Sequence, residues 1–443
     1  MNVAIIGLGY VGVVTAACLA EKGHRVIGVD VDGERVERLN DGIPPVHEVG
    51  LDALLAKHCG ESLMATTDLG AAVRASDVSL IAVGTPTRDG RIDLSHVQAA
   101  ALEIGSFLAV SSEYHVVAVK STVVPGTTDS VVLYALESAS GKRAGVDFGV
   151  GVNPEFLTEG RAVDDFMNPD RIVVSGVDER STKVLEDLYS GFPGVPLIVT
   201  NNKTAELIKY TSNALLATMI SFSNEIADLA SSLDGVDVVD VMRAVHESRY
   251  LTSVVGEQRI AAEINSFLAA GSGFGGSCLP KDVKALAAHG EEMGREMKML
   301  RAVLDVNAGR PGEVLALLRR HVASFADLRV TVLGLAFKPD TDDVRESPAI
   351  PVIDGLLAEG AVVTVHDPVA GQAAMDIWNR RVTPSNDLKD AVAGADAIVL
   401  ITRWREYQRL AEVLDAMEAS PIVVDGRRML EPSDFQNFEG IGL

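Results

Sequence analysis

One short segment restricts the fold of this chain more than any other. In NVAIIGLGYVGVVTAACLAEKGHRVIGVDVD, an apolar run leads into Gly7, Gly9 and Gly12, a helical stretch follows, and a second apolar run ends at Asp30. This glycine spacing between a strand and a helix, with an acid about 20 residues further on, is typical of a βαβ unit that binds a dinucleotide. A glycine turn without a ligand is the alternative. The segment predicts a parallel α/β sheet.

The same segment indicates which dinucleotide would bind. Glycines let the backbone approach a pyrophosphate at the helix N-terminus, where free N–H groups and the helix dipole favour negative charge. The Asp30 carboxylate can accept hydrogen bonds from ribose hydroxyls and would repel a 2′-phosphate. We therefore expect NAD rather than NADP as the cofactor.

Composition limits the classes of partner. The 443 residues are 47% hydrophobic and 23% charged, a mixture typical of a globular protein with two or three domains. The formal net charge is −23, whereas nucleic acids and anionic membranes attract basic surfaces. The apolar N-terminal segment is interrupted by glycines and lacks the basic start of a signal peptide. We expect a cytoplasmic protein that binds neither nucleic acid nor membrane.

The cysteines argue against a disulfide framework. Cys18, Cys59 and Cys278 are an odd number and no pair has the spacing of metal ligands. A reducing compartment and the absence of a metal site are therefore expected.

Strand–helix alternation continues to about residue 200. Three further strands, in DVSLIAVGTPT, HVVAVKSTVVPGT and FGVGVNPEFLTEG, end in small or polar residues at 84–87, 121–122 and 153–155. Open α/β sheets bind ligands at such strand ends, although polar turn residues also occur for purely structural reasons. A second α/β unit begins near Leu328, and Gly334 is the only glycine in its first turn. This unit lacks the full dinucleotide signature and could bind a different nucleotide.

The region between the α/β units has helical periodicity. Residues 201–233 contain neither proline nor glycine, and helical sequence continues to about Arg319. A helix of that length would bridge two domains or lie in a dimer interface. Lys209 and Asn213 are four residues apart and share a face. Lys209 is either an edge residue whose stem covers apolar surface or a desolvated functional amine.

The dodecamer GSGFGGSCLPKD places a cysteine in a reactive setting. Pro280 suits the first turn of a helix, so Cys278 would lie at or just before the helix N-terminus. The helix dipole and free N–H groups there favour a thiolate. Lys281 adds positive charge, and Asp282 can return to the same side of the helix. The pattern favours a nucleophile, the alternative being a small buried hydrophobic residue.

A nucleophilic thiol beside a nicotinamide suggests a reaction. An aldehyde can be trapped as a thiohemiacetal, hydride loss gives a thioester, and water releases the acid. Oxidation of an alcohol to an acid would need two hydride transfers in one enzyme.

In these motifs the chain resembles the nucleotide-sugar 6-dehydrogenases, the family of UDP-glucose and GDP-mannose dehydrogenases. The likeness spans essentially the whole chain and is carried by GLGYVG, GVDVD, VGTPT, KSTVVPGT, NPEFLTEG, ELIKYTSNALLAT, GFGGSCLPKD and FKPDTDDVRESPA. It implies two Rossmann-like, doubly wound α/β domains joined by a central helical domain. These would be an NAD-binding domain in 1–199, a dimer-forming helical domain carrying the cysteine in 200–319, and a nucleotide-sugar-binding domain in 320–443. It also implies oxidation of a sugar C6 alcohol to a carboxylate with reduction of two NAD.

The resemblance assigns catalytic roles to single residues. Cys278 would be the thioester nucleophile, and Lys209 would stabilise oxyanion charge with Asn213 beside it. Asp282 would position a water or exchange a proton with Lys209. Glu155 would be the general base for thioester hydrolysis.

The resemblance also assigns binding residues, including Thr122, which would hold a water. Contacts to NAD would come from Gly7, Gly9, Tyr10, Val11, Gly12, Asp30, Arg35, Thr85, Thr122 and Arg345. Contacts to the nucleotide sugar would come from Glu155, Phe156, Leu157, Glu159, Lys209, Asn213, Gly273, Phe274 and Lys338. Many members have an arginine upstream of the cysteine that reaches a neighbouring subunit, and here the candidates are Arg249 and Arg259.

The substrate remains open between family branches. EGRAVDDFMNPDRIVVSG and SNALLATMISFSNEIA resemble the UDP-glucose branch, which we favour, whereas STVVPGTTDSVV, GKRAGVDFGVGVNPEFL and GSCLPKD lean toward GDP-mannose. Another UDP-sugar, such as a UDP-N-acetylhexosamine, is a further alternative. A two-electron dehydrogenase of the hydroxyacid type would need neither Cys278 nor a second α/β domain. A non-catalytic nucleotide-sugar sensor would be expected to lack one of Cys278, Lys209, Asp282 and Glu155.

Overall fold

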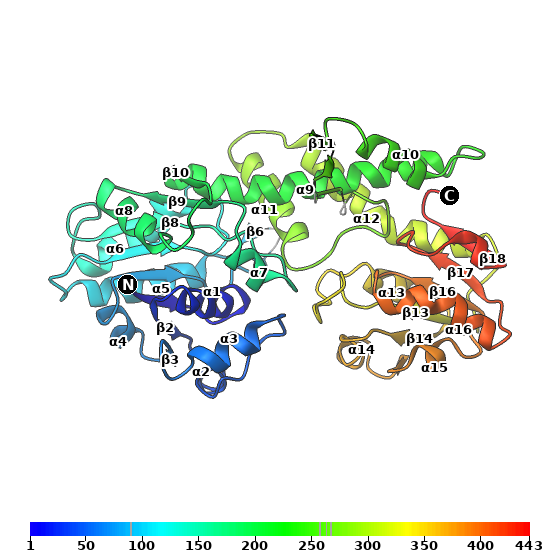
Figure 1. The fold of residues 1–443 in the computed structure, drawn as a ribbon, viewed down its shortest axis with the longest axis horizontal. Coiled ribbons are helices and arrows are strands. Elements are labelled where there is room, and N and C mark those ends of the chain that lie inside the picture. Colours follow the sequence, from blue (N-terminus) through cyan, green and yellow to red (C-terminus); the bar gives the residue numbers. More distant parts are fainter. Residues whose placement is uncertain (89–90, 257, 263, 266–267) are drawn as a thin grey trace. The chain divides into compact units, whose positions relative to one another are not determined.

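The chain folds into two compact units, Met1–Ser212 and Asn213–Leu443. A computed structural model describes residues 1–88, 91–256, 258–262, 264–265 and 268–443, and Figure 1 labels its elements. The division between the units falls within a long helix, α9 (Asn202–Ala230). This helix matches the one that the sequence predicts over residues 201–233.

The first unit is built on one eight-stranded sheet. Its strand order is β10-β9-β8-β7-β4-β1-β2-β3, and all neighbours pair in parallel except β8 and β9. Because β1 lies between β2 and β4, the chain order reverses beside it, and such a point is where open sheets bind ligands. The strands are β1 (Asn2–Ile6), β2 (Arg25–Val29), β3 (Leu63–Thr66), β4 (Val78–Ile81), β7 (Val116–Val119), β8 (Gly149–Val152), β9 (Ile172–Gly176) and β10 (Leu197–Thr200).

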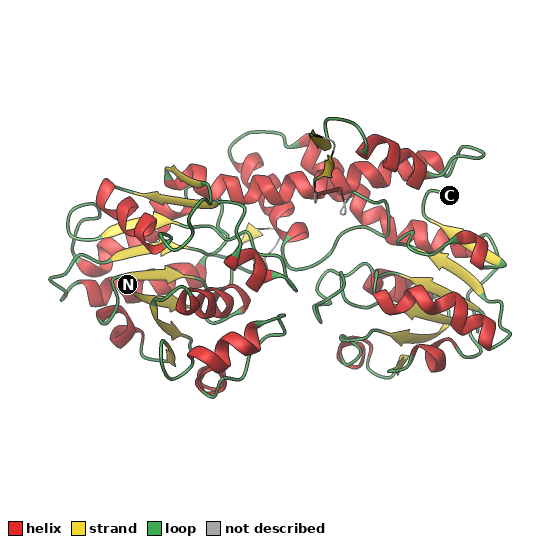
Figure 2. Ribbon diagram, in the orientation of Figure 1, coloured by secondary structure: helices red, strands yellow, loops and turns green. Residues whose placement is uncertain are grey.

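Helices cover both faces of this sheet (Figure 2), as the apolar sequence of β1 requires. Val3 and Ile5 enter one core and Ala4 and Ile6 the other, because successive side chains of a strand point to opposite faces. The first core packs against α1 (Tyr10–Glu21), α2 (Gly33–Asn40), α3 (Leu51–His58), α7 (Ala162–Met167) and α8 (Glu179–Leu188). The second packs against α4 (Leu69–Arg74), α5 (Ser95–Leu108), the π-helical turn η1 (Thr128–Val132) and α6 (Leu133–Ser140). A small hairpin is formed by β5 (Thr87–Arg88) and β6 (Arg91–Ile92).

The second unit contains a six-stranded, fully parallel sheet in the order β15-β14-β13-β16-β17-β18. The second α/β unit predicted to begin near Leu328 is therefore confirmed, and β13 again lies where the chain order reverses. The elements are β13 (Arg329–Leu333), α13 (Ala349–Ala358), β14 (Val362–His366), α14 (Ala373–Trp378), β15 (Val382–Ser385), α15 (Leu388–Val392), β16 (Ala397–Leu400), η3 (Arg405–Arg409), α16 (Leu410–Ala416), β17 (Ile422–Asp425), η4 (Pro432–Asp434) and β18 (Asn437–Gly440).

The helical part of the second unit comprises the rest of α9, α10 (Val238–His246), α11 (Leu279–Glu292) and α12 (Lys298–Arg319). The expectation of helical sequence as far as Arg319 misses one feature, an antiparallel hairpin of β11 (Thr252–Val255) and β12 (Gln258–Ala261). β-branched residues in TSVV favour a strand, and Gly256, at a φ of +63°, adopts the left-handed conformation that a turn needs. Every helix in the described residues is too short or too polar to cross a membrane.

Candidate active site

The glycine turn after β1 has the shape of a dinucleotide-binding turn. Gly7 has a φ of +99°, and a Cβ on Gly12 would lie 1.8 Å from the Gly7 carbonyl oxygen. These two glycines are therefore required by the protein's own packing. A Cβ on Gly9 would meet no described atom within 4 Å, and no described side chain caps the N-terminus of α1. The free N–H groups and the open space beside Gly9 fit a pyrophosphate.

Asp30 is ionised and held in place at the end of β2. Its Oδ2 accepts hydrogen bonds from the Leu8 N–H (2.7 Å) and Arg35 Nη1 (3.0 Å), and its Oδ1 accepts one from the Asp32 N–H (3.0 Å). Burial alone would raise the pKa of Asp30, but these donors outweigh it and the pKa is lowered. A carboxylate has about four acceptor sites, so a ribose hydroxyl can still be accommodated.

Other residues expected at the cofactor form hydrogen bonds between the loops that follow the strands. The Thr85 hydroxyl, after β4, donates to the carbonyl of Thr122, after β7 (3.0 Å). The Tyr10 hydroxyl, in the first turn of α1 beside Val11, donates to the buried Glu48 carboxylate. Glu48 also accepts the Gly160 N–H (2.8 Å). This carboxylate, which sequence reasoning missed, joins the cofactor turn to the loop that follows β8.

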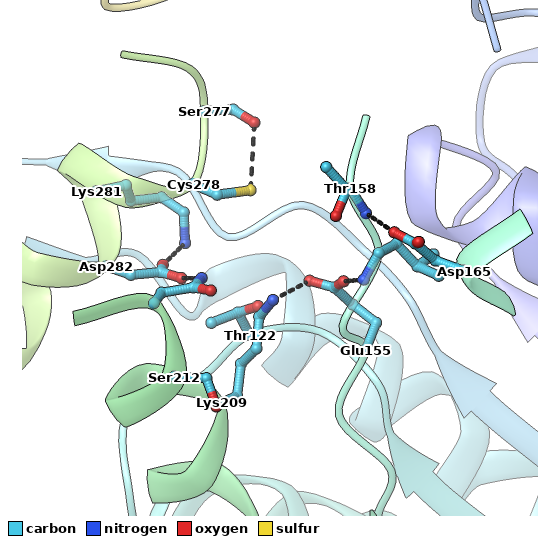
Figure 3. Close-up of polar contacts among 12 residues, drawn as sticks. Thr122, Glu155, Thr158, Asp165, Lys209, Ser212, Ser277, Cys278, Lys281 and Asp282 are labelled. Atoms are coloured by element: carbon cyan, nitrogen blue, oxygen red, sulfur yellow. Dashed lines mark hydrogen bonds and ion pairs between the residues drawn. The ribbon is translucent and has the colours of Figure 1, made fainter. Parts of the chain in front are cut away.

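Lys209 and Glu155 form a buried ion pair in the first unit, with Lys209 Nζ 2.9 Å from Glu155 Oε1 (Figure 3). Packing of Ala205 in α9 against Val152 and Val173 of the sheet brings the two side chains together. Because Glu155 and Lys209 are far apart in the sequence, no local pattern indicated that they form a pair.

The Glu155 carboxylate stays ionised despite its burial. Burial alone would raise the pKa of Glu155, but the charge of Lys209, the Leu157 N–H (2.6 Å) and the charge of Lys120 lower it. An ionised, buried carboxylate can act as a general base near neutral pH.

Phe156, Leu157 and Glu159 are half-buried in the same loop. The Phe156 ring lies 4.0 Å from the Arg171 guanidinium carbon and 5.7 Å from Lys209 Nζ. The face of the Phe156 ring therefore attracts the Lys209 ammonium through a cation–π interaction.

In the second unit, Cys278 occupies the N-cap position of α11, and Pro280 lies in the first turn. This part of the sequence-based prediction is confirmed. Cys278 is half-buried and forms no disulfide, and its Sγ lies 3.5 Å from the Ser277 Oγ (Figure 3). The position supplies the helix-dipole environment that favours a thiolate.

Asp282 is buried one turn after Cys278, with 1% of its surface exposed. Its carboxylate accepts hydrogen bonds from Asn213 Nδ2 (2.6 Å) and Lys281 Nζ (2.7 Å), as Figure 3 shows for Lys281. The Asp282 N–H also donates to the Cys278 carbonyl (2.8 Å). The buried carboxylate is therefore paired, as a charge in that position requires.

The glycine run before Cys278 is packed tightly. Gly273 has a φ of +96°, and a Cβ on Gly275 would lie 2.3 Å from the Glu346 carbonyl oxygen. The Asn307 side chain accepts the Phe274 N–H (2.8 Å) and donates to the Phe274 carbonyl (3.0 Å). Contacts within the protein therefore hold the backbone of the glycine run that leads to Cys278.

Two half-buried arginines that sequence reasoning missed follow β16 and β17. Arg427 donates to the carbonyls of Ile401 (2.5 Å) and Gly273 (2.9 Å), and Arg403 Nε donates to the carbonyl of Arg427 (2.9 Å). Burial, with the charge of Arg403, lowers the pKa of Arg427 to about 10. Two guanidiniums bonded to carbonyls form a positive region that suits an anionic ligand. Their position at strand ends, in ITRW and DGRR, was the available signal.

The remaining predicted residues lie in exposed or half-buried loops and in the hairpin. Arg345 pairs with Asp343 (2.7 Å) in the loop after β13, where Lys338 Nζ lies 5.9 Å from the centre of the Phe337 ring. Arg249 is exposed before the hairpin, and Arg259 in β12 donates to the Glu247 carbonyl (2.7 Å). Within the described ranges, no group of three His, Cys, Asp or Glu side chains could hold a metal ion.

Three family models match successive parts of the chain. Residues 1–193 match the NAD binding domain of the UDP-glucose/GDP-mannose dehydrogenase family, residues 203–309 its central domain, and residues 331–432 its UDP binding domain. The residues at the glycine turn are thus those of an NAD-binding domain.

Curated and solved proteins resemble the chain over its whole length. The UDP-glucose 6-dehydrogenase AglM of Haloferax volcanii is 42% identical over 100% of both chains. The GDP-mannose 6-dehydrogenase of Pseudomonas putida is 37% identical over 93% of both. A solved UDP-glucose dehydrogenase from Pyrobaculum islandicum is 40% identical, with a TM-score of 0.89 over 99% of this chain and 97% of that one.

Proposed function

The chain belongs to the UDP-glucose/GDP-mannose dehydrogenase family, and from this premise we propose that it oxidises the C6 alcohol of UDP-glucose to the carboxylate of UDP-glucuronate. The observation that carries the proposal is the position of Cys278 at the N-terminus of α11, behind a tightly packed glycine run. A two-electron dehydrogenase has no use for a nucleophilic thiol, whereas a four-electron oxidation needs one to hold the aldehyde.

The proposed chemistry uses the buried Lys209–Glu155 ion pair and the Cys278 thiol. NAD, held at the turn of Gly7, Gly9 and Gly12, would accept the hydride that leaves the sugar carbon, and a second NAD would accept the hydride of the second oxidation. The Lys209 ammonium, with Asn213 one turn further along α9, stabilises negative charge on the sugar oxygen. The Cys278 thiolate adds to the aldehyde carbon, and loss of the second hydride leaves a thioester. Glu155 then takes a proton from the water that attacks the thioester, and the thiolate leaves.

Supporting roles follow from the contacts of the remaining residues. Asp282, which accepts hydrogen bonds from Asn213 and Lys281, holds the Asn213 amide, and Thr122 is assigned to hold a water. Arg427 and Arg403, both half-buried, supply positive charge for the diphosphate of the nucleotide sugar. Lys338, in the loop after β13, is assigned to the same ligand.

The domain boundaries at 199/200 and 319/320 are part of this proposal. They divide the chain into an NAD-binding, a central and a nucleotide-sugar-binding part, close to the ranges that the family models match.

A homodimer and a cytoplasmic location complete the proposal. Leu215, Phe222 and Leu229 recur every seven residues along α9, and each exposes more than half of its side chain, at 56%, 55% and 58%. An apolar stripe of this kind suits packing against a second helix, and a second copy could bring Arg249 or Arg259 to its neighbour's site. None of the three cysteines forms a disulfide in the part of the chain that the structure describes, which suits a reducing compartment.

A second candidate substrate is GDP-mannose, because the Pseudomonas putida relative acts on it and matches most of the chain. The deciding experiment measures the NADH formed at completion with limiting UDP-glucose in one assay and limiting GDP-mannose in another. Two NADH per sugar with UDP-glucose support the proposal, and two with GDP-mannose transfer it to the second candidate. No NADH with either sugar would direct the search to UDP-N-acetylhexosamines.

The thiol is tested in the same assay. Cys278→Ser should form no acid and at most one NADH per sugar, whereas Cys59→Ser, which changes another half-buried cysteine, should behave as wild type. One NADH per sugar from the wild-type protein would contradict the role of Cys278.

A further inference from the structure

A second buried lysine lies in the first unit, and no role has been assigned to it so far. Lys120 directly follows β7 and exposes only 3% of its surface. Its Nζ donates to Asn153 Oδ1 (3.0 Å) and lies 5.8 Å from the centre of the Phe166 ring. Lysines are almost never fully buried without a reason, because desolvating an ammonium is costly.

Both polar atoms of the Asn153 side chain, to which Lys120 donates, form hydrogen bonds within the protein. Its Oδ1 also accepts the Tyr189 hydroxyl (2.5 Å), and its Nδ2 donates to the Val173 carbonyl (2.9 Å). The Asn153 N–H donates to the Val119 carbonyl (2.9 Å). Asn153 begins the loop after β8, and Glu155 follows it two residues later in the same loop. Lys120 therefore contacts the start of the segment that carries the carboxylate.

Lys120 also acts on Glu155 through its charge. The ionisable groups that act on Lys120 are Glu155, which follows β8, and Lys209, on α9. Tyr189, after α8, shares the Asn153 oxygen and has a raised pKa because of burial, so its hydroxyl stays neutral. Two ammonium groups thus act on one buried carboxylate. The nearby Phe166 ring, from α7, carries no charge.

We propose that Lys120 is a positioning residue for Glu155: it orients the loop through Asn153 and supplies a second buried positive charge that keeps the carboxylate ionised. The inference rests on the proposed function, in which Glu155 is the general base for thioester hydrolysis. Lys209 holds the carboxylate directly, and Lys120 extends the pH range over which the base is available.

The test follows hydrolysis of the thioester by single-turnover kinetics, with the covalent adduct measured by intact mass across pH 3 to 7, because the pKa of Glu155 is lowered from 4.5. In Lys120→Met the acid limb of the rate should move to higher pH by about one unit, so that the rate at low pH falls about tenfold. Lys120→Arg, which keeps the charge, should restore the wild-type limb. Lys142→Met is the matched control, because Lys142 Nζ in the same unit donates only to backbone carbonyls among its described contacts.

A second variant covers the case in which Lys120→Met does not fold. Asn153→Asp keeps the side-chain shape but loses the hydrogen bond from Nδ2 to the Val173 carbonyl. It gives Lys120 a carboxylate partner whose negative charge offsets the effect of Lys120 on Glu155. The acid limb should then move in the same direction. An unchanged limb in Lys120→Met, or in Asn153→Asp where that is the variant that folds, overturns the proposal.

The outcome for Glu155 is read separately. If Glu155→Gln accumulates no adduct, the general base lies elsewhere and the proposed function fails in that step, whatever the Lys120 variants do. If Glu155→Gln accumulates adduct while the folded variant of Lys120 or Asn153 keeps the wild-type pH profile, only the role of Lys120 is overturned.

Discussion

At the scale of single residues, burial and charge act in opposite directions on Glu155. Its carboxylate is 6% exposed, an environment that favours the protonated form, yet Lys209 lies 2.9 Å away and the Leu157 N–H donates at 2.6 Å. The charged partner and the donor outweigh burial, so the pKa of Glu155 is lowered. The group is therefore a base that is ready at neutral pH.

Replacing the base should trap the intermediate. Glu155→Gln keeps the shape of the side chain but cannot accept a proton, so hydrolysis should slow by about 10²–10⁴-fold. A covalent sugar–enzyme adduct should accumulate and be visible by intact mass. Glu113→Gln, a change at an exposed glutamate of the same unit, should leave the protein free of adduct.

Lys120 should make stability depend on pH in a defined range. Burial lowers the pKa of Lys120 from 10.5 to about 8. Between these pH values the unfolded lysine holds a proton that the folded one has lost, so the free energy of unfolding rises with pH there. Below pH 8 the buried charge costs about 3 kcal/mol, constant with pH.

The comparison of two lysine variants tests this cost. The Tm of Lys120→Met relative to wild type should fall as the pH rises from 8 to 10, because wild type loses its buried charge over that range. The same difference for Lys142→Met should stay level. A pH-independent difference for Lys120→Met would mean that Lys120 keeps its proton in the folded protein between pH 8 and 10, so that its pKa is not lowered.

At the scale of elements, the turn between β1 and α1 shows two reasons for a glycine. Gly12 is required because a Cβ would lie 1.8 Å from the Gly7 carbonyl oxygen, whereas a Cβ on Gly9 would meet no described atom within 4 Å. The first reason concerns folding, and the second concerns a ligand that approaches the N-terminus of α1.

Alanine at the two positions should separate these reasons. Gly12→Ala should lower the Tm, since overpacking of this kind costs about 1–3 kcal/mol or more. Gly9→Ala should keep the wild-type Tm in the absence of ligand and bind NAD more weakly, because the methyl group occupies the space of the pyrophosphate. Thermal unfolding and fluorescence titration with NADH measure the two effects. Wild-type affinity in Gly9→Ala would place the pyrophosphate elsewhere.

At the scale of the whole molecule, α9 contributes to the packing of both units. Its early residues pack against the eight-stranded sheet, and its last turns, through Ala227 and Ala230, enter the core of the second unit. The stripe of Leu215, Phe222 and Leu229 stays exposed along the same helix. Monomeric proteins seldom expose a regular apolar stripe of this kind.

A charge within the stripe should separate the subunits. Phe222→Asp is expected to convert the dimer to a monomer at micromolar concentration, measured by sedimentation velocity. Val110→Asp, a change at another exposed apolar residue outside α9, should leave the dimer intact. A monomeric wild-type protein under the same conditions would contradict the proposed interface.

Local pattern was sufficient for most elements and for part of the site. The glycine spacing predicted the turn after β1, the run without glycine or proline predicted α9, and Pro280 predicted that Cys278 precedes a helix. Each of these predictions depends on residues that are neighbours in sequence, where propensity and capping act. The β11–β12 hairpin was missed because a short strand pair within a helical region has weak local signals.

The sequence by itself determined the strands beside the first turn and the long helix α9, where the cofactor turn lies and which helix begins at the cysteine. Only the tertiary structure decided that Lys209 meets Glu155, that Lys120 reaches Asn153 and that Arg427 contacts the glycine run. The physical reason is that periodicity shows which face of an element is buried but not what covers that face. The charge state of a buried group depends on those distant partners, and therefore on the packing of the whole unit.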